Sequence, residues 1–428
     1  MKLYEHQSKG LEAVKDLDHV AFYWDMGLGK TYAGSEKMMQ LGARINLVVC
    51  QKSKINDWVD HFEQNYEHWC DHIFDLTNAS QLDVCMWEWS CGNTCVGIIN
   101  YDLIWRRSEL LKLKDFTLLL DESSLIQTET AKRSKFILKL KPKNVILLSG
   151  TPTGGKYEKL WSQMRLLGWN ISKDLYWKQF VKVDYLDMVG KSIPVVVGYK
   201  NVDRLKRKMN QYGCQFLKTD EVFDLPSQNF QKVRIAASKE YRKFRKDKIV
   251  TIGNETLVGD TTLTRMLYER QLCGQYSEKK LKAFADLVES TEDRLIVFYN
   301  FTAELEAMQK VLLDLNFTDY SKRFSVVNGQ VKGLQNYENK SNSITFIQYQ
   351  AGAMGLNLQK ACRMVFFTLP LSSELYEQAK KRIHRIGQDR PCFYYQLIVT
   401  GSVEEKILAT LEMRKDYTEK LFEKDDAM

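Results

Sequence analysis

Short apolar runs that end in polar or glycine-rich turns recur along the first half of the chain. They predict strands at Ile45–Cys50, Val96–Ile99, Phe116–Leu120 and Val145–Leu148. Runs of this length and composition are typical of buried strands in a parallel sheet with helices on both faces. The first half of the chain therefore predicts an α/β lobe.

A second series of apolar runs begins after Leu225-Pro226. The strands that it predicts are Leu295–Tyr299, Phe324–Val327, Ile344–Ile347, Met364–Phe367 and Phe393–Ile398. Residues 403–422 then predict a helix with an apolar face, made by Ile407, Leu408, Leu411 and Leu421. This half of the chain predicts a second α/β lobe with a closing C-terminal helix.

The segment between the two series has a different composition. From Ile171 to Phe223 it is rich in Lys and Tyr, and it predicts mainly helical and irregular structure. We therefore expect an α/β fold of two lobes with helical material between them. The expected domains are residues 1–224, with a helical insertion at about 171–224, and residues 225–428.

The length and charge of the chain place only weak limits on the number of domains and on the kind of partner. The 428 residues are enough for two or three domains that each bury a core. The chain has only six prolines and no Gly/Ser-rich stretch, which favours packed lobes over domains on a flexible linker. Lys and Arg number 62 and Asp and Glu 54, so the formal charge is +8. That excess is compatible with a polyanionic partner, although many proteins without one carry similar charge.

Apolar runs and cysteines bear on the location of the protein. No run is long enough to span a bilayer, and the opening residues MKLYEHQSKG contain no hydrophobic signal segment, so we expect a cytoplasmic protein. The nine cysteines are odd in number and scattered, which argues against a disulfide framework. Six residues that could bind zinc fall close together: His68, Cys70, His72, Cys85, Cys91 and Cys95. Their spacings match no familiar zinc pattern, so we favour core thiols and surface histidines over a zinc site.

The first chemical motif is DMGLGKT, at Asp25–Thr31. Glycines let backbone N–H groups approach phosphates, and the N-terminus of a following helix favours an anion. Lys30 would reach the β- and γ-phosphates, and the Thr31 hydroxyl would bind magnesium. The first glycine of the usual GxxxxGK[ST] pattern is replaced by Trp24, so an ordinary glycine-rich turn is the alternative.

The second motif makes a nucleotide site the stronger interpretation. Phe116–Glu122 reads FTLLLDE, an apolar strand that ends in two carboxylates. Ligands of α/β sheets bind at the carboxyl ends of strands. Asp121 could hold magnesium, and Glu122 could orient or deprotonate the attacking water. The alternative is that Asp121 or Ser123 only caps the next helix.

Two further segments extend the site. LLSGTP at Leu147–Pro152 predicts a strand and a small polar turn beside the carboxylates, which could relay changes at the γ-phosphate to a bound polymer. QAKKRIHRIGQ at Gln378–Gln388 carries Arg382 and Arg385, which share a face if the segment is helical and ends at Gly387-Gln388. A guanidinium from a facing lobe can neutralise charge on the transferring phosphoryl group. A solvated basic face is the alternative.

The ordered set of motifs resembles the Swi/Snf family of ATP-dependent DNA translocases, within the second helicase superfamily. The quoted series is YEHQ, DMGLGKT, CQKSKINDW, INYDL, DESS, SGTP, FLKTDEVFDLP, LIVFYNF, AGAMGLNL and QAKKRIHRIGQ. It spans nearly the whole chain, and AGxxGLNL with HRIGQ is highly specific. The resemblance implies two RecA-like lobes, with parallel sheets flanked by helices. It also implies a compact motor ATPase similar to bacterial or phage members of the family.

The resemblance also implies site residues. Gln7 would recognise adenine, and Glu122, Arg382 and Arg385 would be catalytic. The remaining ATP-binding residues would be Met26, Gly27, Leu28, Gly29, Lys30, Thr31 and Gly355. Magnesium would be held by Thr31 and Asp121. The DNA track would include Lys52, Ser53, Asn100 and Tyr101.

Two positions depart from the family pattern. Ser124 stands where members usually have the His of DEAH or DEGH, a position that links the nucleotide site to later motifs. Gln348, Tyr349 and Gln350 replace the usual Ser-Thr-Arg/Lys before the glycine-rich turn, so DNA contacts there do not carry over directly.

The sequence as a whole predicts an ATPase that binds ATP with magnesium in a cleft between its lobes and moves along DNA. Because the grip is through phosphates, little sequence specificity is expected, and duplex DNA is the favoured partner. The first alternative is a strand-separating DNA or RNA helicase of the same superfamily. The second is a non-hydrolysing DNA-binding regulatory protein, against which the intact Lys30, Asp121 and Glu122 argue.

Overall fold

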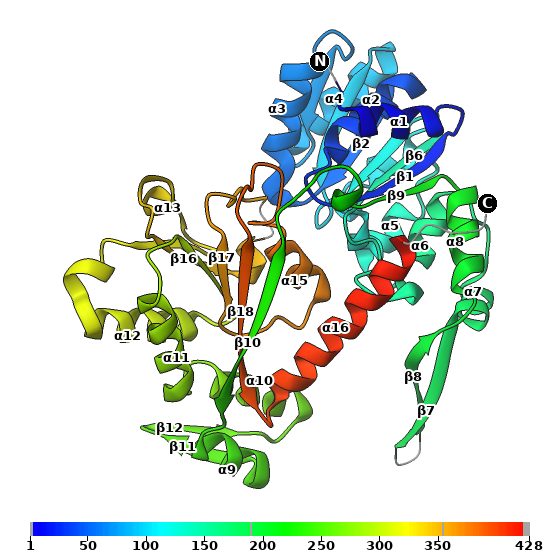
Figure 1. Ribbon diagram of the computed structural model, residues 1–428. Helices are drawn as coiled ribbons and strands as arrows, with labels where there is room; N and C mark the ends of the chain where they lie inside the picture. The colour runs from blue at the N-terminus through cyan, green and yellow to red at the C-terminus, as the bar shows by residue number, and fades with distance from the viewer. Residues whose placement is uncertain (1–2, 189–190, 353–354, 423–428) are drawn as a thin grey trace. The chain divides into compact units, whose positions relative to one another are not determined.

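The computed structural model describes residues 3–188, 191–352 and 355–422. The chain divides into two compact units, the first made of residues 1–222 together with residues from 416 onward and the second of Phe223–Lys415. Each unit is built on a seven-stranded sheet, shown in Figure 1. In the part of the chain that is described, no helix has the length and apolar character needed to cross a membrane.

The first sheet is parallel throughout, with strand order β3-β4-β2-β5-β6-β1-β9. In that order the strands are His72–Asp75, Cys95–Asn100, Ile45–Cys50, Thr117–Asp121, Asn144–Leu148, His19–Trp24 and Cys214–Leu217. The four strands predicted from apolar runs in this half are confirmed as β2, β4, β5 and β6.

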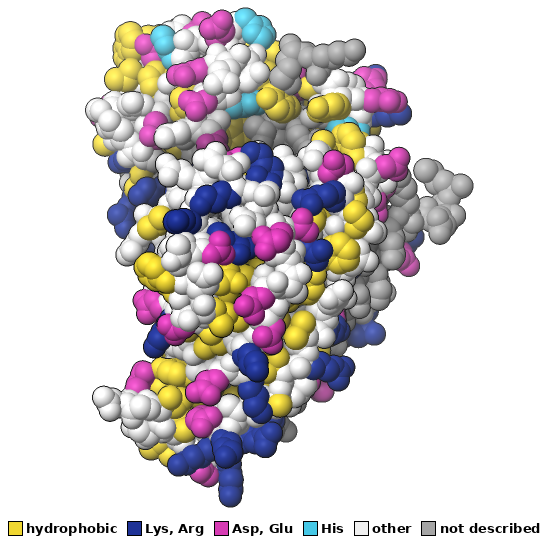
Figure 2. Space-filling view, turned by 60° about the vertical axis from the view of Figure 1, so that its left-hand side comes forward, with side chains coloured by type: hydrophobic (Ala, Val, Ile, Leu, Met, Phe, Trp, Pro, Cys, Tyr) yellow, Lys and Arg dark blue, Asp and Glu magenta, His cyan; other side chains and the backbone are white. Residues whose placement is uncertain are grey.

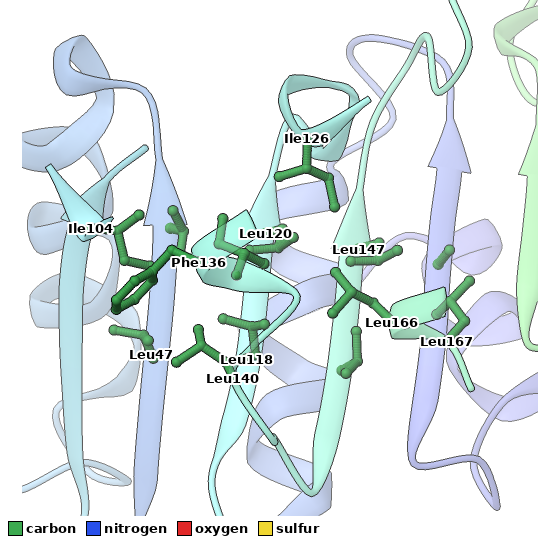
Figure 3. Packing of buried hydrophobic residues seen from close by; sticks show 14 of the residues in the cluster. Leu47, Ile104, Leu118, Leu120, Ile126, Phe136, Leu140, Leu147, Leu166 and Leu167 are labelled. Carbon is green, nitrogen blue, oxygen red and sulfur yellow. The ribbon is translucent and has the colours of Figure 1, made fainter. Parts of the chain in front are cut away.

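Burial on both faces explains why these strands are continuously apolar. Leu118 and Leu120 of β5 pack with Leu147 of β6 in the main core of the unit. Figure 3 shows them together with Ile126 and Phe136, which come from the segments covering this side of the sheet. The opposite side chain of β5, Leu119, is equally buried. Each such side chain contributes about 1.5–3 kcal/mol relative to an exposed one.

Helices cover the first sheet and connect its strands. They are α1 Glu5–Ala13, α2 Lys30–Leu41, α3 Ile55–Tyr66, α4 Ala79–Cys91, α5 Lys132–Ile137, α6 Trp161–Leu166, α7 Lys173–Phe180 and α8 Val202–Gln211. Short 3-10 helices are η1 Lys52–Lys54, η2 Ile104–Arg106, η3 Ser108–Lys112, η4 Ser123–Ile126, η5 Tyr157–Lys159 and η6 Thr219–Glu221. Close helix packing is visible at Gly34 of α2, where an added Cβ would lie 3.0 Å from Leu148 Cδ1.

The segment expected to be mainly helical and irregular is partly a β structure. Strands β7 Val181–Met188 and β8 Lys191–Tyr199 form an antiparallel ribbon, and β9 joins the first sheet beside β1. The expectation was wrong here because the strands are stabilised by pairing with each other, which the composition of the segment does not reveal. Val183 pairs with Val196, and Asp184 pairs with Val195. The expected domain boundaries and insertion stay a prediction.

The second sheet has strand order β10-β18-β17-β13-β16-β14-β15. Its strands in that order are Gln228–Ala236, Cys392–Thr400, Arg363–Phe366, Leu295–Tyr299, Ile344–Gln348, Phe324–Val327 and Lys332–Gly333. All neighbours are parallel except β14 and β15. The five predicted strands of this half are confirmed as β13, β14, β16, β17 and β18.

Two cores lie on opposite faces of the second sheet. Alternate residues of β13 belong to different cores, with Val297 in one and Ile296 and Phe298 in the other. The helices are α9 Lys239–Asp247, α10 Thr262–Cys273, α11 Glu278–Glu289, α12 Thr302–Tyr320, α13 Gln335–Asn339, α14 Tyr349–Gly352, α15 Ser373–Lys380 and α16 Val403–Phe422. A two-stranded ribbon, β11 Ile249–Ile252 and β12 Glu255–Val258, packs beside α9. The predicted α/β class with two lobes is confirmed.

Candidate functional site

The motifs of the first unit meet at one edge of its sheet. Strands β4, β2, β5, β6 and β1 are consecutive neighbours and parallel, so their carboxyl ends lie along the same edge. The loops that follow them contain, in that order, the INYDL, CQKSK, DESS, SGTP and DMGLGKT motifs. Ligands of α/β sheets bind at this edge. The topology therefore collects motifs that are up to about 120 residues apart in the chain.

The glycine-rich loop after β1 contains two glycines in the left-handed region of backbone conformation. Gly27 and Gly29 have φ of +88° and +70°, which a residue with a side chain rarely adopts. A Cβ at Gly29 would lie 2.1 Å from Gln7 Nε2, whereas one at Gly27 would meet no atom within 4 Å. Gly29 is the N-cap of α2. The loop therefore offers open space beside Gly27, next to the positive end of a helix.

Lys30 is held inside this loop. Its ammonium group donates to the carbonyls of Trp24 and Asp25, at 2.9 and 3.1 Å. The SGTP turn lies against the same group, because a Cβ at Gly150 would stand 3.5 Å from Lys30 Nζ and 3.3 Å from Met26 Cγ. The Asp25 carboxylate accepts from the amide and hydroxyl of Thr219, which ties the loop to the segment after β9.

Gln7 lies beside the loop, as its expected role at the nucleotide requires. Its side chain is buried, and its Nε2 donates to the carbonyls of Leu28 and Gly29 at 3.4 and 3.3 Å. Its Oε1 accepts from the amide of Tyr4 at 2.9 Å. The amide is therefore oriented at the loop, while its contact with adenine stays a prediction.

Asp121 ends β5 in a partly buried position. Trp58 Nε1 of α3 donates to Asp121 Oδ2 at 2.9 Å, and the Tyr101 hydroxyl donates to the Asp121 carbonyl at 2.8 Å. Burial raises the pKa of Asp121, and the Trp58 hydrogen bond and the charge of Lys30 counteract that rise. A carboxylate in this setting favours a cation, because burial penalises its isolated charge.

Glu122 follows in a strained conformation. Its φ of +53° and ψ of 58° lie in the left-handed region that non-glycine residues seldom occupy. Strain of this kind costs about 1–3 kcal/mol and persists where surrounding contacts enforce it. The Ser149 hydroxyl of the SGTP turn lies 3.4 Å from Glu122 Oε2, a long contact. The strain turns Glu122 out of the regular alternation of β5 at the sheet edge.

A buried amide connects the carboxylate turn to the SGTP turn. Gln163 of α6 has no exposed surface, and its Oε1 accepts from the hydroxyls of Ser123 and Tyr23 at 2.8 and 2.9 Å. Its Nε2 donates to the Pro152 carbonyl at 2.8 Å. The residue beside Glu122 is thus joined to the loop after β6 through one side chain. Ser124, at the usual position of His, is fully buried.

Sequence reasoning missed Trp58 and Gln163 as parts of the site. Trp58 lies in the quoted CQKSKINDW motif, so its place in a motif was the available signal. Gln163 had no signal of its own, because a polar residue in a short helix is usually exposed.

The residues at the edge fit the groups that the motifs imply. Asp121 and Thr31 offer a carboxylate and a hydroxyl, the hard oxygen donors that Mg²⁺ prefers. Gly27 leaves room for a phosphate beside the backbone, and Lys30 supplies a cation within electrostatic reach of Asp121. The site can therefore hold a magnesium-bound polyphosphate.

The expected DNA-track residues differ in exposure. Lys52 and Ser53 are exposed on η1, after β2. Asn100 and Tyr101 are buried, at 7% and 2% exposure. The Tyr101 phenol faces the Asp121 carbonyl, so a DNA contact there would involve its backbone. All four contacts stay predictions.

The arginines of the second unit are not on a helix, which corrects the expectation of a shared helical face ending at Gly387-Gln388. Helix α15 ends at Lys380, and turns follow, with the Arg382 amide bonded to Ala379 O and the Gln388 amide to Arg385 O. The helix ends early because Gly387 has φ of +90° and the buried Gln388 amide donates to Ile383 O at 3.1 Å and Ala361 O at 2.8 Å.

These turns bring the arginines to the glycine-rich segment after β16. The Arg382 carbonyl accepts from the Leu358 amide at 3.1 Å. Arg385 Nη1 donates to Asn357 Oδ1, and burial lowers the pKa of Arg385. Gly355 has φ of +71° in the same segment, whose residues 353–354 lie outside the described residues. The AGAMGLNL and HRIGQ motifs therefore form one structural unit.

Comparisons with known proteins give matches along most of the chain. A family model described as the SNF2-related domain matches residues 6–278. A model described as the helicase conserved C-terminal domain matches residues 279–387.

Named relatives are similar over most of this chain but are longer. The mouse SWI/SNF-related matrix-associated actin-dependent regulator of chromatin subfamily A member 1 is 22% identical over 91% of this chain and 40% of its own length. The Saccharomyces cerevisiae DNA repair and recombination protein RAD26 is 25% identical over 70% of this chain and 31% of its own length. The chain thus spans about two fifths or less of these relatives. The Sulfolobus solfataricus SWI2/SNF2 ATPase core in complex with dsDNA is 19% identical, with a TM-score of 0.45 over 98% of this chain and 92% of that one.

Proposed function

We propose that this chain, which belongs to the SNF2-related family of nucleic-acid-dependent ATPases, hydrolyses ATP to move along duplex DNA. The observation that carries the proposal is the convergence of Lys30, Asp121 and Glu122 at one edge of the first sheet. Neighbouring strands β1, β6 and β5 place a phosphate-binding loop next to two carboxylates. Phosphoryl transfer to water needs this combination.

Each residue of the first unit has a proposed role. Lys30 leaves its carbonyl partners and neutralises the β- and γ-phosphates, which the backbone of the loop holds at Gly27 and Gly29. Thr31 and Asp121 would hold a magnesium ion, which would supply charge neutralisation on the phosphate oxygens. Glu122 orients the attacking water and accepts its proton.

In the second unit, Arg382 and Arg385 are the proposed arginine fingers. The planar guanidinium of Arg385 is held by Asn357, so its orientation is set before it meets a phosphate. Stabilisation of charge on the transferring phosphoryl group by such a residue increases the rate by several orders of magnitude.

The proposal that the chain acts on DNA rests on its relatives and on two exposed residues. The relatives named above are a regulator of chromatin and a DNA repair and recombination protein. Exposed Lys52 and Ser53, at the edge that carries the motifs, support contact with a phosphate backbone. Contacts of this type follow an intact duplex and need no access to bases.

One observation favours a second candidate, a strand-separating helicase. The β7–β8 ribbon carries exposed apolar side chains, with Tyr185 at 63% and Val197 at 58% exposure. A ribbon with an exposed aromatic side chain could stack on a base at a fork. This candidate shares the ATP chemistry and differs only in what movement does to the duplex.

The test compares ATP turnover without nucleic acid and with duplex DNA, single-stranded DNA or RNA, with Lys30→Ala as the blank. We expect duplex DNA to stimulate most, and stimulation to weaken as salt rises. A triplex substrate should lose its third strand in an ATP-dependent manner, while a forked duplex should stay paired. Fork unwinding without triplex displacement, abolished in Tyr185→Ala, would establish the second candidate instead.

A further inference from the structure

Helix α9 of the second unit, Lys239–Asp247, is strongly basic on one face. Its sequence KEYRKFRKD holds five cations and two carboxylates. Arg242, Lys243 and Lys246 are exposed and are neighbours at helical spacing. Tyr241 and Phe244, on the other side of the helix, are buried in the core of the unit. We name Arg242, Lys243 and Lys246 the α9 basic face.

The charges of this face are not neutralised by carboxylates. Within the described ranges, none of its three side chains lies within ion-pair distance of an Asp or Glu, whereas exposed Lys232 pairs with Glu412 at 2.8 Å. The nearby Glu240 is engaged at the helix N-terminus, where hydrogen bonds from its own backbone and Ser238 lower its pKa. The face therefore presents three uncompensated positive charges to solvent.

The helix that carries the face is held firmly. The Ser238 hydroxyl caps its N-terminus by accepting from the Tyr241 amide at 3.1 Å. The Tyr241 hydroxyl accepts from the Val403 amide at 2.9 Å, and Arg245 is occupied by the Gly401 carbonyl. A fixed helix loses little conformational entropy when its exposed cations bind a ligand.

Helix α9 begins at the same edge of the second sheet as the loops that follow β13 and β16. The helix follows β10, which is parallel to β18, β17, β13 and β16, so it begins at the carboxyl edge of the second sheet. The loops after β13 and β16 leave the sheet at the same edge, where β13 is the third strand from β10. Figure 2 shows Lys and Arg side chains gathered at the lower edge of the view, the height at which Figure 1 places α9.

We propose that the α9 basic face binds the phosphate backbone of DNA, as an additional contact surface on the second unit. This rests on the proposed function, because it assumes that the chain binds DNA. From Arg242 to Lys246 the helix rises about 6 Å, and each strand of duplex DNA presents a phosphate about every 3.4 Å of the axis. The α9 basic face therefore spans about two phosphates of one strand. Binding of this kind carries no sequence preference.

The test removes the three charges and keeps the side chains polar. The variant Arg242→Gln/Lys243→Gln/Lys246→Gln is compared with Lys282→Gln/Lys310→Gln/Lys332→Gln, which removes three exposed and equally unpaired charges from α11, α12 and β15. Binding to a fluorescent duplex is measured by anisotropy over a series of KCl concentrations. Thermal unfolding of each variant shows that it is folded.

We expect the magnitude of the slope of log affinity against log salt to fall by about 2 in the α9 variant, because each neutralised phosphate contributes roughly 0.9. The matched control should keep the wild-type slope. Equal slopes in the α9 variant and wild type would overturn this proposal and leave DNA binding intact. Absence of any duplex binding by wild type would instead overturn the proposed function. Loss of binding to phosphatidylserine vesicles, with the DNA slope unchanged, would assign the face to a lipid surface.

Discussion

The indole nitrogen of Trp58 lies 2.9 Å from Oδ2 of Asp121 and donates a hydrogen bond to it. Trp58 is buried on α3, so the donor is fixed by packing and not by the carboxylate alone. A partner of this type fixes the orientation of a metal-binding carboxylate. Trp58 is therefore a positioning residue for the proposed magnesium site.

Trp58→Phe should weaken magnesium binding while the ring continues to fill its place. Loss of such a partner lowers metal affinity about 10- to 100-fold, so half-maximal ATP hydrolysis should need correspondingly more Mg²⁺. The measurement is a Mg²⁺ titration at saturating ATP, with direct binding of Mn²⁺ as a second readout. Trp89→Phe is the matched control, because its Nε1 donates to the Cys95 carbonyl in the core. An equal shift in both variants would contradict the role of Trp58.

Substitutions at Lys30 and Glu122 should distinguish ATP binding from ATP hydrolysis. Lys30→Ala should abolish turnover, because the cation for the transferring phosphates is lost. Glu122→Gln should bind ATP normally but lower turnover by orders of magnitude, since shape is kept and the carboxylate is lost. Equilibrium binding of a fluorescent ATP analogue and phosphate release are the measurements, with the exposed Glu63→Gln as the control. Near-normal turnover in Glu122→Gln would remove it from the mechanism.

Gln163→Met should lower the turnover number about ten-fold and leave the KM for ATP nearly unchanged. The substitution keeps volume but leaves the hydroxyls of Ser123 and Tyr23 without their acceptor, at a cost of about 1–3 kcal/mol each. Gln396→Met is the control, because Gln396 is also buried and donates to the Tyr376 hydroxyl in the second unit. If both variants lose stability equally and turnover equally, Gln163 has only a structural role.

Arg385→Ala should reduce turnover by several orders of magnitude while DNA affinity stays near wild type. Arg385→Lys should fail as well, because an ammonium group cannot reproduce the planar fork held by Asn357. Arg390→Ala serves as the control, since Arg390 pairs with Asp293 at 3.0 Å. Kinetics at saturating DNA and anisotropy binding together make the test. Loss of DNA binding with normal turnover per bound complex would place Arg385 on the DNA track.

His61 should make the first unit less stable at acid pH. Burial lowers the pKa of His61 from 6.5 to about 4, while its ring nitrogen contacts the Ser35 hydroxyl at 3.0 Å. Between these values the unfolded chain binds the proton and the folded one does not, so stability falls as pH falls from about 6.5 to 4. The loss approaches about 3 kcal/mol below pH 4. Urea unfolding across this range should show a flatter pH dependence in His61→Gln.

Much of the fold and of the candidate site was readable from local pattern. Continuous apolar runs predicted the strands β2, β5 and β13, because a strand buried on both faces needs apolar residues at every position. The phosphate loop was readable for a similar reason. Its glycines and Lys30 are contiguous, and their chemistry depends on a local backbone conformation.

Predictions from local sequence pattern were wrong in two segments where tertiary contacts outweigh the local preference. The segment around Arg382 and Arg385 has helical spacing, yet Gln388 bonds to backbone carbonyls and ends α15 at Lys380. The ribbon β7–β8 forms where charged and aromatic residues suggested helix, because cross-strand pairing outweighs weak local preference.

The sequence by itself determined the two α/β lobes, the position of the glycine-rich loop and the pair of carboxylates at the end of β5. Only the tertiary structure decided which residues support them. Trp58 and Asp121 are 63 positions apart, and Ser123 and Gln163 are 40 apart. Such contacts depend on strand order and on how helices pack over the sheet. Those arrangements minimise the free energy of the whole unit, so no short stretch of sequence contains them.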